Sequence, residues 1–111
     1  SAIMLSNHGG RQLDGSRSPF DQLPAIVDAV GGKIEIIVDG GIRRGSHVLK
    51  ALALGATACS FGKGFLFALG AGGQEGVEMV LQRMKDEIRR DMILMGCKNI
   101  KELNPSKIAY R

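Results

Sequence analysis

The sequence predicts an α/β fold in which three consecutive βα units form the last part of a (β/α)8 barrel. Three short apolar runs alternate with longer segments whose apolar residues recur at helical spacing. A glycine-containing turn with polar side chains follows each run. Strands that alternate with helices in this way form a parallel sheet with the helices packed outside it.

The length of the chain favours a partial barrel over a complete small sheet. A whole barrel takes about 250 residues, and this chain has 111. A small doubly wound sheet is the alternative, but three parallel strands alone would leave two edges with unpaired backbone groups. We therefore expect residues 1–111 to be the C-terminal portion of a barrel, namely strands 6 to 8 and the helices that follow them.

The first unit has an expected strand at residues 2–6 and a helix that begins after Ser18. Serine is a good N-cap, and Pro19 suits the first position of a helix. The glycine pair that starts at Gly31 is expected to end this helix.

The second unit has an expected strand at residues 34–38, where β-branched residues are frequent. Ser46 is expected to cap its helix. The third unit has a strand at residues 58–61 and a short helix near residues 65–69. A glycine-rich stretch then separates this short helix from a long helix over residues 74–95.

The long helix is predicted to have one buried and one solvated face. Apolar residues spaced three and four apart form the expected buried stripe, which consists of Val77, Val80, Leu81, Met84, Ile88 and Met92. The remaining charged residues predict a solvated surface, made of Lys85, Asp86, Glu87, Arg89 and Arg90.

The composition argues against several classes of function. The net charge is +4, but the chain has only four Phe and one Tyr, whereas nucleic-acid-binding surfaces usually combine basic stripes with aromatic platforms. The two cysteines, Cys59 and Cys97, form neither a metal-ligand spacing nor a disulfide framework. No apolar run reaches the roughly 18 residues that span a bilayer. We expect a cytoplasmic protein without nucleic acid or metal, with a peroxisomal or membrane-surface location as the alternative.

Polar residues gather where the predicted strands end. His8 and Arg11 follow the first strand, residues 39–44 follow the second, and Gly62-Lys63-Gly64 follows the third. In (β/α)8 barrels the active site lies at the C-terminal ends of the strands. The sequence therefore places all of these residues on the rim that would carry the chemistry.

The last two of these loops predict a phosphate site. Loops after the final two strands of such barrels often bind phosphate through backbone N–H groups. Gly40-Gly41 and Gly62-Lys63-Gly64 leave the backbone open, while Arg43 and Arg44 add positive charge. The alternative is that these glycines serve only tight strand-to-helix turns.

His8 and Arg11 suggest a second chemical function. A histidine after a strand, with an arginine three residues on, can place a base beside a carboxylate clamp. Asp14 would orient one of them or cap a turn. A lone histidine is more often structural than catalytic, so the spacing by itself leaves both interpretations open.

Residues 6–14, Ser-Asn-His-Gly-Gly-Arg-Gln-Leu-Asp, resemble the signature of the FMN-dependent 2-hydroxy-acid oxidases and dehydrogenases. That family includes glycolate oxidase, lactate oxidase, mandelate dehydrogenase and the flavin domain of flavocytochrome b2. The resemblance continues through residues 39–45, 50–56, 72–77 and 95–97, and so covers nearly the whole chain with its motifs in order.

The resemblance implies a role for each matched residue. His8 matches the base that takes a proton from the 2-hydroxy acid, and Arg11 matches the arginine that grips its carboxylate. The residues that match the FMN site are Ser6 near the flavin, Asp39, Gly40, Gly41 and Arg43 at the ribityl phosphate, and Gly62 and Lys63 at a second phosphate contact. The implied reaction is oxidation of a 2-hydroxy acid to the 2-oxo acid with FMN as cofactor. Oxygen, a quinone or a haem would accept the electrons, and a homo-oligomer is expected.

Two departures from the family pattern bear on function. The family commonly has arginine after the glycine at position 62, whereas Lys63 offers a point charge in place of a two-bond contact. The family's flavin-contacting lysine, second substrate arginine, pocket tyrosines and histidine-orienting aspartate all lie upstream of this chain. We therefore expect the isolated chain to be inactive and the activity to require the missing N-terminal part.

Two other readings remain as alternatives. One is a different FMN- and phosphate-binding barrel, such as a type 2 isopentenyl diphosphate isomerase, although the His8 and Arg11 motif argues against it. The other is a non-catalytic half-barrel that associates with copies of itself through its open sheet edges.

Overall fold

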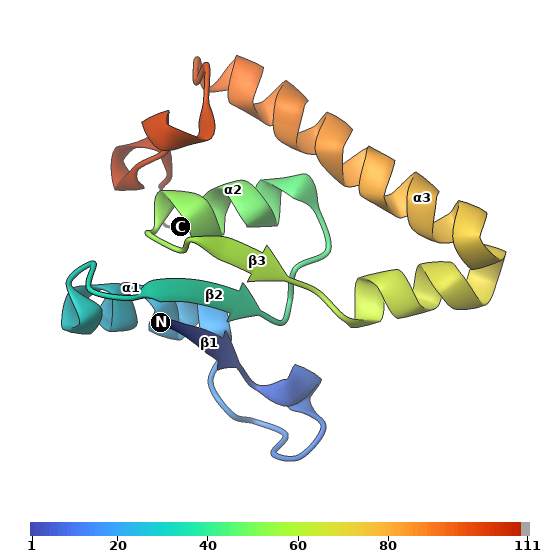
Figure 1. Ribbon diagram of the computed structural model, residues 1–111, viewed down its shortest axis with the longest axis horizontal. Coiled ribbons are helices and arrows are strands. Elements are labelled where there is room, and N and C mark those ends of the chain that lie inside the picture. The colour runs from blue at the N-terminus through green and yellow to red at the C-terminus, as the bar shows by residue number, and fades with distance from the viewer. Residues whose placement is uncertain (110–111) are drawn as a thin grey trace.

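Three parallel strands form the centre of the molecule. The computed structural model describes residues 1–109 and contains β1 (Ala2–Ser6), β2 (Glu35–Asp39) and β3 (Ala58–Ser60) in the order β1-β2-β3 (Figure 1). Both pairings are parallel. The three predicted strands are confirmed, with β2 shifted by one residue and β3 ending one residue earlier than expected.

Helix α1 (Pro19–Val30) connects β1 to β2 and has the predicted ends. The Ser18 side chain accepts a hydrogen bond from the Phe20 N–H at 3.2 Å. At the other end, Gly31 adopts a left-handed conformation with φ of 57°, which glycine allows without steric cost. Local sequence signals therefore set both boundaries of this helix.

The helices cover one face of the sheet. Ile36 and Val38 alternate with exposed or half-buried neighbours along β2 and are buried in one cluster with Leu23 of α1 and Ala51 of α2 (Gly45–Ala53). On β1, Met4 points away from this cluster and is 56% exposed. One face of the sheet is thus packed against helices while the other is partly open, as in a section of barrel wall.

Helix α3 (Lys63–Leu94) is broken at Gly72 and Gly73, whose backbone angles are not helical. Figure 1 shows the two parts meeting at a steep angle, with the longer part running past α2. The predicted short helix, glycine break and long helix are confirmed. Gly73 has φ of 57° and ψ of −142°, a combination that is essentially restricted to glycine.

The long part of α3 departs from its predicted pattern at two residues. Leu81, assigned to the buried stripe, is 45% exposed, and Glu87, assigned to the solvated face, is buried. The assignment of Glu87 was wrong because the N-terminal end of α2, against which α3 packs, has an N–H group that needs a polar partner. The assignment of Leu81 was wrong because no described element packs fully over it. Two short turns, Ile100–Glu102 and Pro105–Lys107, complete the described chain.

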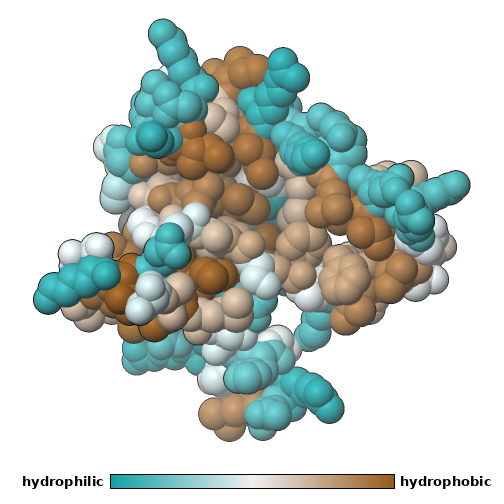
Figure 2. All heavy atoms as spheres, viewed as in Figure 1, coloured by the Kyte–Doolittle hydropathy of each residue, from teal (hydrophilic) through white to brown (hydrophobic). Residues whose placement is uncertain are grey.

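Several large apolar side chains lie on the surface. Phe67 is 74% exposed and Leu66 is 55% exposed on the first part of α3. Figure 2 shows apolar residues gathered over the bend of α3, at the right of that view. Within residues 1–109, none of the helices combines the length and the apolar composition of a membrane span.

Candidate functional site

The turns that follow the three strands begin side by side. Ser6 pairs with Asp39 in the β1–β2 register, and Asp39 pairs with Ser60 in the β2–β3 register. Each of these residues is the last of its strand. The three segments singled out from the sequence therefore meet at one edge of the sheet.

A short chain of hydrogen bonds joins the first two segments. The Ser6 hydroxyl donates to Asp39 Oδ2 at 2.7 Å and accepts from the His8 N–H at 3.0 Å. A hydroxyl bonded to a carboxylate forms one of the stronger hydrogen bonds in proteins. Ser6 and Asp39 therefore hold the backbone of His8 in relation to the β2 turn.

His8 has an unusual backbone conformation. Its φ is 54°, and it is the one non-glycine residue with positive φ among residues 1–109. The turn continues through Gly9 and Gly10, and the Asn7 side chain accepts from the Gly9 N–H at 3.1 Å. A left-handed conformation costs a non-glycine residue about 1 to 2 kcal/mol, and such strain is concentrated at functional sites. Asn7, for which the sequence predicted no role, helps to hold His8 in this conformation through its bond to Gly9.

Lys63 links the third segment to the first. Its Nζ donates to the Gly9 carbonyl oxygen at 2.8 Å, across 54 residues of sequence. Arg11 is exposed, and its backbone N–H donates to the His8 carbonyl oxygen at 3.3 Å. Within residues 1–109 the Arg11 side chain makes no hydrogen bond. The structure brings Lys63 to the His8 loop and leaves the Arg11 guanidinium available to a ligand.

The backbone is open at two of the predicted phosphate-binding glycines. A Cβ atom placed on Gly41 or on Gly62 would meet nothing within 4 Å. Gly41 has φ of 75°, which favours glycine in any case, but Gly62 has φ of −104°, which any residue can adopt. Neither crowding nor conformation within the described chain requires glycine at position 62. An open backbone next to the exposed Arg43 and Lys63 side chains is a suitable place for a phosphate to approach N–H groups.

The N-terminus of α2 is closed by a residue from α3. The Gly45 N–H donates to Glu87 Oε2 at 2.8 Å, and Arg83 Nε donates to Glu87 Oε1 at 3.3 Å. The predicted Ser46 cap was wrong, because α2 begins at Gly45, two residues earlier than a cap at Ser46 implies, and the carboxylate supplied by α3 takes the place of a local side chain. The hydrogen bond from Gly45, followed by the pairing with Arg83, lowers the pKa of Glu87 and keeps it ionised.

Cys59 and His47 also have shifted pKa values. Burial raises the pKa of the Cys59 thiol to about 11, so it stays protonated and is a poor nucleophile at neutral pH. Burial also lowers the pKa of His47, and the positive charges of Lys50, Arg43 and Arg44 lower it further, although a hydrogen bond with the Gly41 backbone acts in the opposite direction. Within residues 1–109, no three His, Cys, Asp or Glu side chains are grouped to hold a metal ion.

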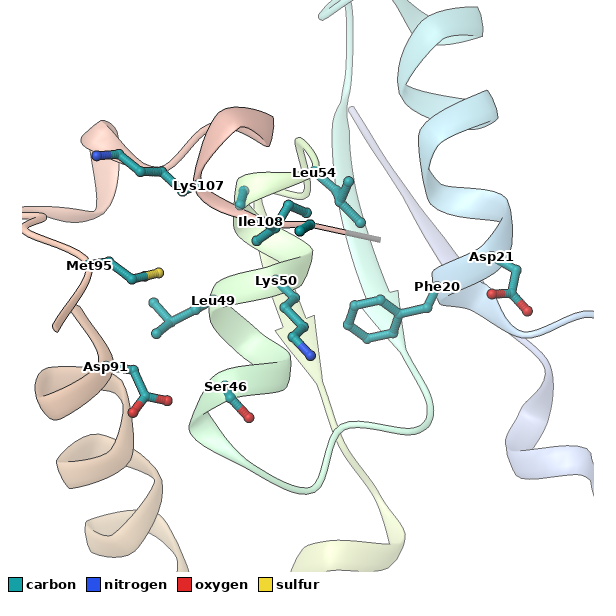
Figure 3. A pocket seen from close by; sticks show the side chains of 12 residues that line it. Phe20, Asp21, Ser46, Leu49, Lys50, Leu54, Asp91, Met95, Lys107 and Ile108 are labelled. Atoms are coloured by element: carbon teal, nitrogen blue, oxygen red, sulfur yellow. The ribbon is translucent and has the colours of Figure 1, made fainter. Parts of the chain in front are cut away.

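The cavity drawn in Figure 3 lies away from these residues. It has a volume of about 790 Å³ and lies between the start of α1, one side of α2, the end of α3 and the C-terminal turns. Phe20 and Leu54 border one side, while Asp91 and Met95 border another. None of the predicted site residues lines it, so the site described above is an open rim and this cavity is separate from it.

The sequence matches a known family along almost its whole length. The family model described as FMN-dependent dehydrogenase matches residues 1–110. The chain is 49% identical over 105 residues to an L-lactate oxidase of Nostoc sp., covering 95% of this chain and 29% of that protein. It is 47% identical over 108 residues to 2-hydroxyacid oxidase 1 of Homo sapiens, covering 97% of this chain and 29% of that protein. The chain therefore spans less than a third of the length of these curated relatives.

Solved structures agree with these sequence matches. A flavocytochrome b2 variant with sulfite bound superposes with a TM-score of 0.90 at 44% identity, covering 96% of this chain and 28% of that one. A mandelate oxidase with benzoyl-formic acid superposes with a TM-score of 0.85 at 49% identity, covering 89% of this chain and 30% of that one. The predicted fold is thereby confirmed, and the three βα units are a portion of a (β/α)8 barrel.

Proposed function

The chain belongs to the family of FMN-dependent dehydrogenases, and we propose that it supplies the last three βα units of a barrel that oxidises a 2-hydroxy acid to the 2-oxo acid. The observation that carries this proposal is the hydrogen-bonded frame of Ser6, Asp39 and Lys63 around the left-handed His8. It joins the proposed substrate end of the site to the proposed phosphate end.

The open glycines support a phosphate-binding role for the two later turns. The space that a Cβ would take at Gly41 and Gly62 is free, and Arg43 and Lys63 carry the positive charge that a phosphate group needs. These residues fit the phosphate of FMN, the cofactor of the family. Lys63 uses one of its three N–H donors on Gly9, which leaves two for an anion.

Asp39 has a different role from the cations around it. A carboxylate repels phosphate, but it accepts hydrogen bonds from hydroxyl groups. Asp39 already accepts from Ser6 through Oδ2 and retains further lone pairs. We assign it to the ribityl hydroxyls of FMN and to the support of the His8 loop, with Gly40 and Gly41 leading from it to the phosphate.

His8 and Arg11 would act on the substrate. The Arg11 guanidinium pairs with the substrate carboxylate and fixes the orientation of its α-carbon. The His8 imidazole then takes a proton from the 2-hydroxy acid. FMN, when bound, would accept the two electrons and the remaining hydrogen of this oxidation. Oxygen, a quinone or a haem would receive them afterwards.

The activity is proposed for the completed barrel, because this chain contributes only part of the wall. Mixing the chain with FMN and L-lactate is expected to give no reduction of a redox dye. Adding a separately expressed fragment with the first five βα units of a lactate oxidase relative is expected to restore turnover. Dye reduction by the chain alone would contradict the need for the rest of the barrel.

The matched control for this experiment is His8→Gln. The complemented variant is expected to retain the visible absorption of bound flavin but to lose turnover by at least about 100-fold, which is a typical contribution of a general base. Undiminished turnover by His8→Gln would remove His8 from its catalytic assignment. Loss of flavin as well would mean that His8 holds the cofactor site together.

Self-association is a second candidate function, favoured by the open surfaces. Strands β1 and β3 each have one neighbour, and Met4 and Phe67 are largely exposed. Sedimentation at increasing concentration separates the two candidates. Association of the chain alone would favour a self-assembled half-barrel, whereas a monomer that binds the complementary fragment would favour the flavoenzyme.

A further inference from the structure

His47 reaches back from α2 to the turn that precedes it. It is the third residue of the helix, and its Nδ1 accepts a hydrogen bond from the Arg43 N–H at 3.2 Å. Arg44, which occupies the N-cap position, makes no side-chain capping bond. In a capping box, the side chain at this third position likewise reaches back to a backbone N–H at the start of the helix. His47 makes the same kind of contact through its imidazole, but its partner is the N–H of Arg43, the residue before the N-cap.

The turn that ends at this bond contains two glycines. Gly40 and Gly41 both have positive φ values, 110° and 75°. Glycines lose more conformational freedom on ordering than other residues, so a side chain that holds the Arg43 end of the turn restricts a segment that would otherwise be mobile.

The imidazole can hold Arg43 in this way only when Nδ1 carries no proton. The charged groups around it are Arg43 and Arg44 on the turn, Lys50 on its own helix, and Arg83 and Glu87 on α3, which line the same surface hollow. The Glu87 carboxylate is already bonded to Gly45 and Arg83. Burial and the surrounding cations lower the pKa of His47, so it is neutral at pH 7.

We propose that neutral His47 is a positioning residue that holds the Arg43 end of the Gly41–Arg43 turn in the shape that receives phosphate, and that protonation of His47 releases the Arg43 N–H. The inference rests on the proposed phosphate role of this turn. It assigns to His47 a contribution that comes through backbone geometry and requires no contact with the ligand. A preformed set of N–H donors binds an anion better because less ordering is required on binding.

The first part of the test uses the 111-residue chain without any ligand. Nuclear magnetic resonance is used to follow the His47 ring and the Arg43 amide together from pH 8 to pH 4.5. The Arg43 amide signal is expected to move with the midpoint of the His47 titration. At pH 7, His47→Leu is expected to increase amide exchange at Arg43 by about tenfold, the loss expected for one ordinary hydrogen bond. His47→Gln keeps an acceptor and is expected to remain within about threefold of the unmodified chain.

These readouts decide the inference on their own. An Arg43 amide that ignores the His47 titration would overturn it, and so would unchanged exchange in a folded His47→Leu variant. Circular dichroism checks that the variant is folded. If His47→Leu does not fold, the titration of the unmodified chain and the exchange rate of His47→Gln still test whether His47 holds the Arg43 N–H.

The second part adds inorganic phosphate at pH 8, where His47 is neutral. His47→Leu is expected to bind phosphate at least about fivefold more weakly than His47→Gln. Equal binding by both variants would contradict the link between the shape of the turn and phosphate affinity. The Arg43 amide signal could follow the His47 titration in an unmodified chain that does not bind phosphate. That result would count against the proposed phosphate role of the turn.

Discussion

The N-terminal ends of α2 and α3 lie on the same rim and are built in opposite ways. At α2, the Gly45 N–H is bonded to the buried Glu87, and a Cβ on Gly45 would come within 2.7 Å of the Met84 oxygen and the Ile88 nitrogen. At α3, Gly62 makes no side-chain cap and has free space around it. Both positions have glycine, but for different physical reasons.

The difference indicates which helix end is available to an anion. Exposed N–H groups and the helix dipole favour an anion at a helix N-terminus. At α2 the Glu87 carboxylate takes the place of such an anion and links α3 to α2. In α3 the position remains open beside Lys63. We therefore propose that phosphate binds at Gly62 and the Gly40–Arg43 turn, whereas Gly45 has a structural role.

The largest loss of stability is expected for a methyl group added at Gly45, where Glu87 closes the N-terminus of α2. Gly45→Ala is expected to lower the free energy of unfolding by about 3 kcal/mol, because the atoms it meets belong to the rigid backbone of α3. Gly62→Ala is the matched variant at the open end, with an expected change below about 0.5 kcal/mol. Urea denaturation measures both. Equal destabilisation by the two variants would remove the contrast between the two helix ends.

The next effect concerns the carboxylate that closes α2. Glu87→Leu leaves the Gly45 N–H without an acceptor and is expected to cost about 2 kcal/mol. Glu87→Gln keeps an acceptor and is expected to cost about half as much. Thermal denaturation distinguishes them, and a Leu variant as stable as the Gln variant would contradict the cap.

Glu87 also makes stability depend on pH. Its pKa is lowered in the folded chain from the ordinary value of 4.5, so the unfolded chain binds the proton more readily. Its contribution to stability is therefore fully present above about pH 4.5 and is lost as the pH falls through the lowered folded value. The difference in stability between the unmodified chain and Glu87→Gln is expected to shrink over that acid range. A constant difference would show that the ionised carboxylate is unimportant.

A smaller effect is expected at the junction of β1 and β2. Ser6→Ala removes the acceptor of the His8 N–H and the donor to Asp39, with an expected loss of about 1 kcal/mol. Amide exchange at His8 is expected to rise by roughly tenfold at the same time. Ser60→Ala, at the corresponding end of β3, is the control. If both variants leave His8 unchanged, the left-handed turn is held by Asn7 and Lys63 without Ser6.

The smallest effect on stability is expected for the exposed contact of Lys63. Lys63→Met removes the bond to the Gly9 carbonyl and is expected to change stability by less than about 0.5 kcal/mol, since the bond is open to solvent. Binding of inorganic phosphate is expected to weaken by about threefold or more. Lys63→Arg retains both functions and serves as the control. Unchanged phosphate binding in Lys63→Met would show that the role of Lys63 is limited to its contact with the His8 loop.

Local signals in the sequence predict much of the fold. Ser18, Pro19 and Gly31 set the ends of α1, and the glycine pair in α3 separates its two parts. Each of these signals acts on backbone groups within a few residues of itself, so neighbouring sequence is sufficient to read it. The order of strands follows for the same reason, because short βα connections leave few topologies.

The candidate site could be located from the sequence, but its internal connections could not. The rim position of His8, Asp39 and Lys63 follows from the ends of the strands. Their bonds join residues 33 and 54 positions apart, as in Ser6 with Asp39 and Lys63 with Gly9. No spacing pattern encodes such pairs. His47 is an intermediate case, since its bond to Arg43 spans four residues, and a capping box with histidine in place of glutamate would have been the signal.

The sequence by itself determined the three βα units, the two ends of α1 and the family to which the chain belongs, because these depend on periodicity, caps and motifs that are local. Only the tertiary structure decided that Glu87 is buried, that Gly45 must be small and that Gly62 faces open space. Those properties depend on which residues of other elements pack against each position. A glutamate on a helix is solvated by default, and it becomes a buried cap only when a helix N-terminus from another part of the chain lies against it.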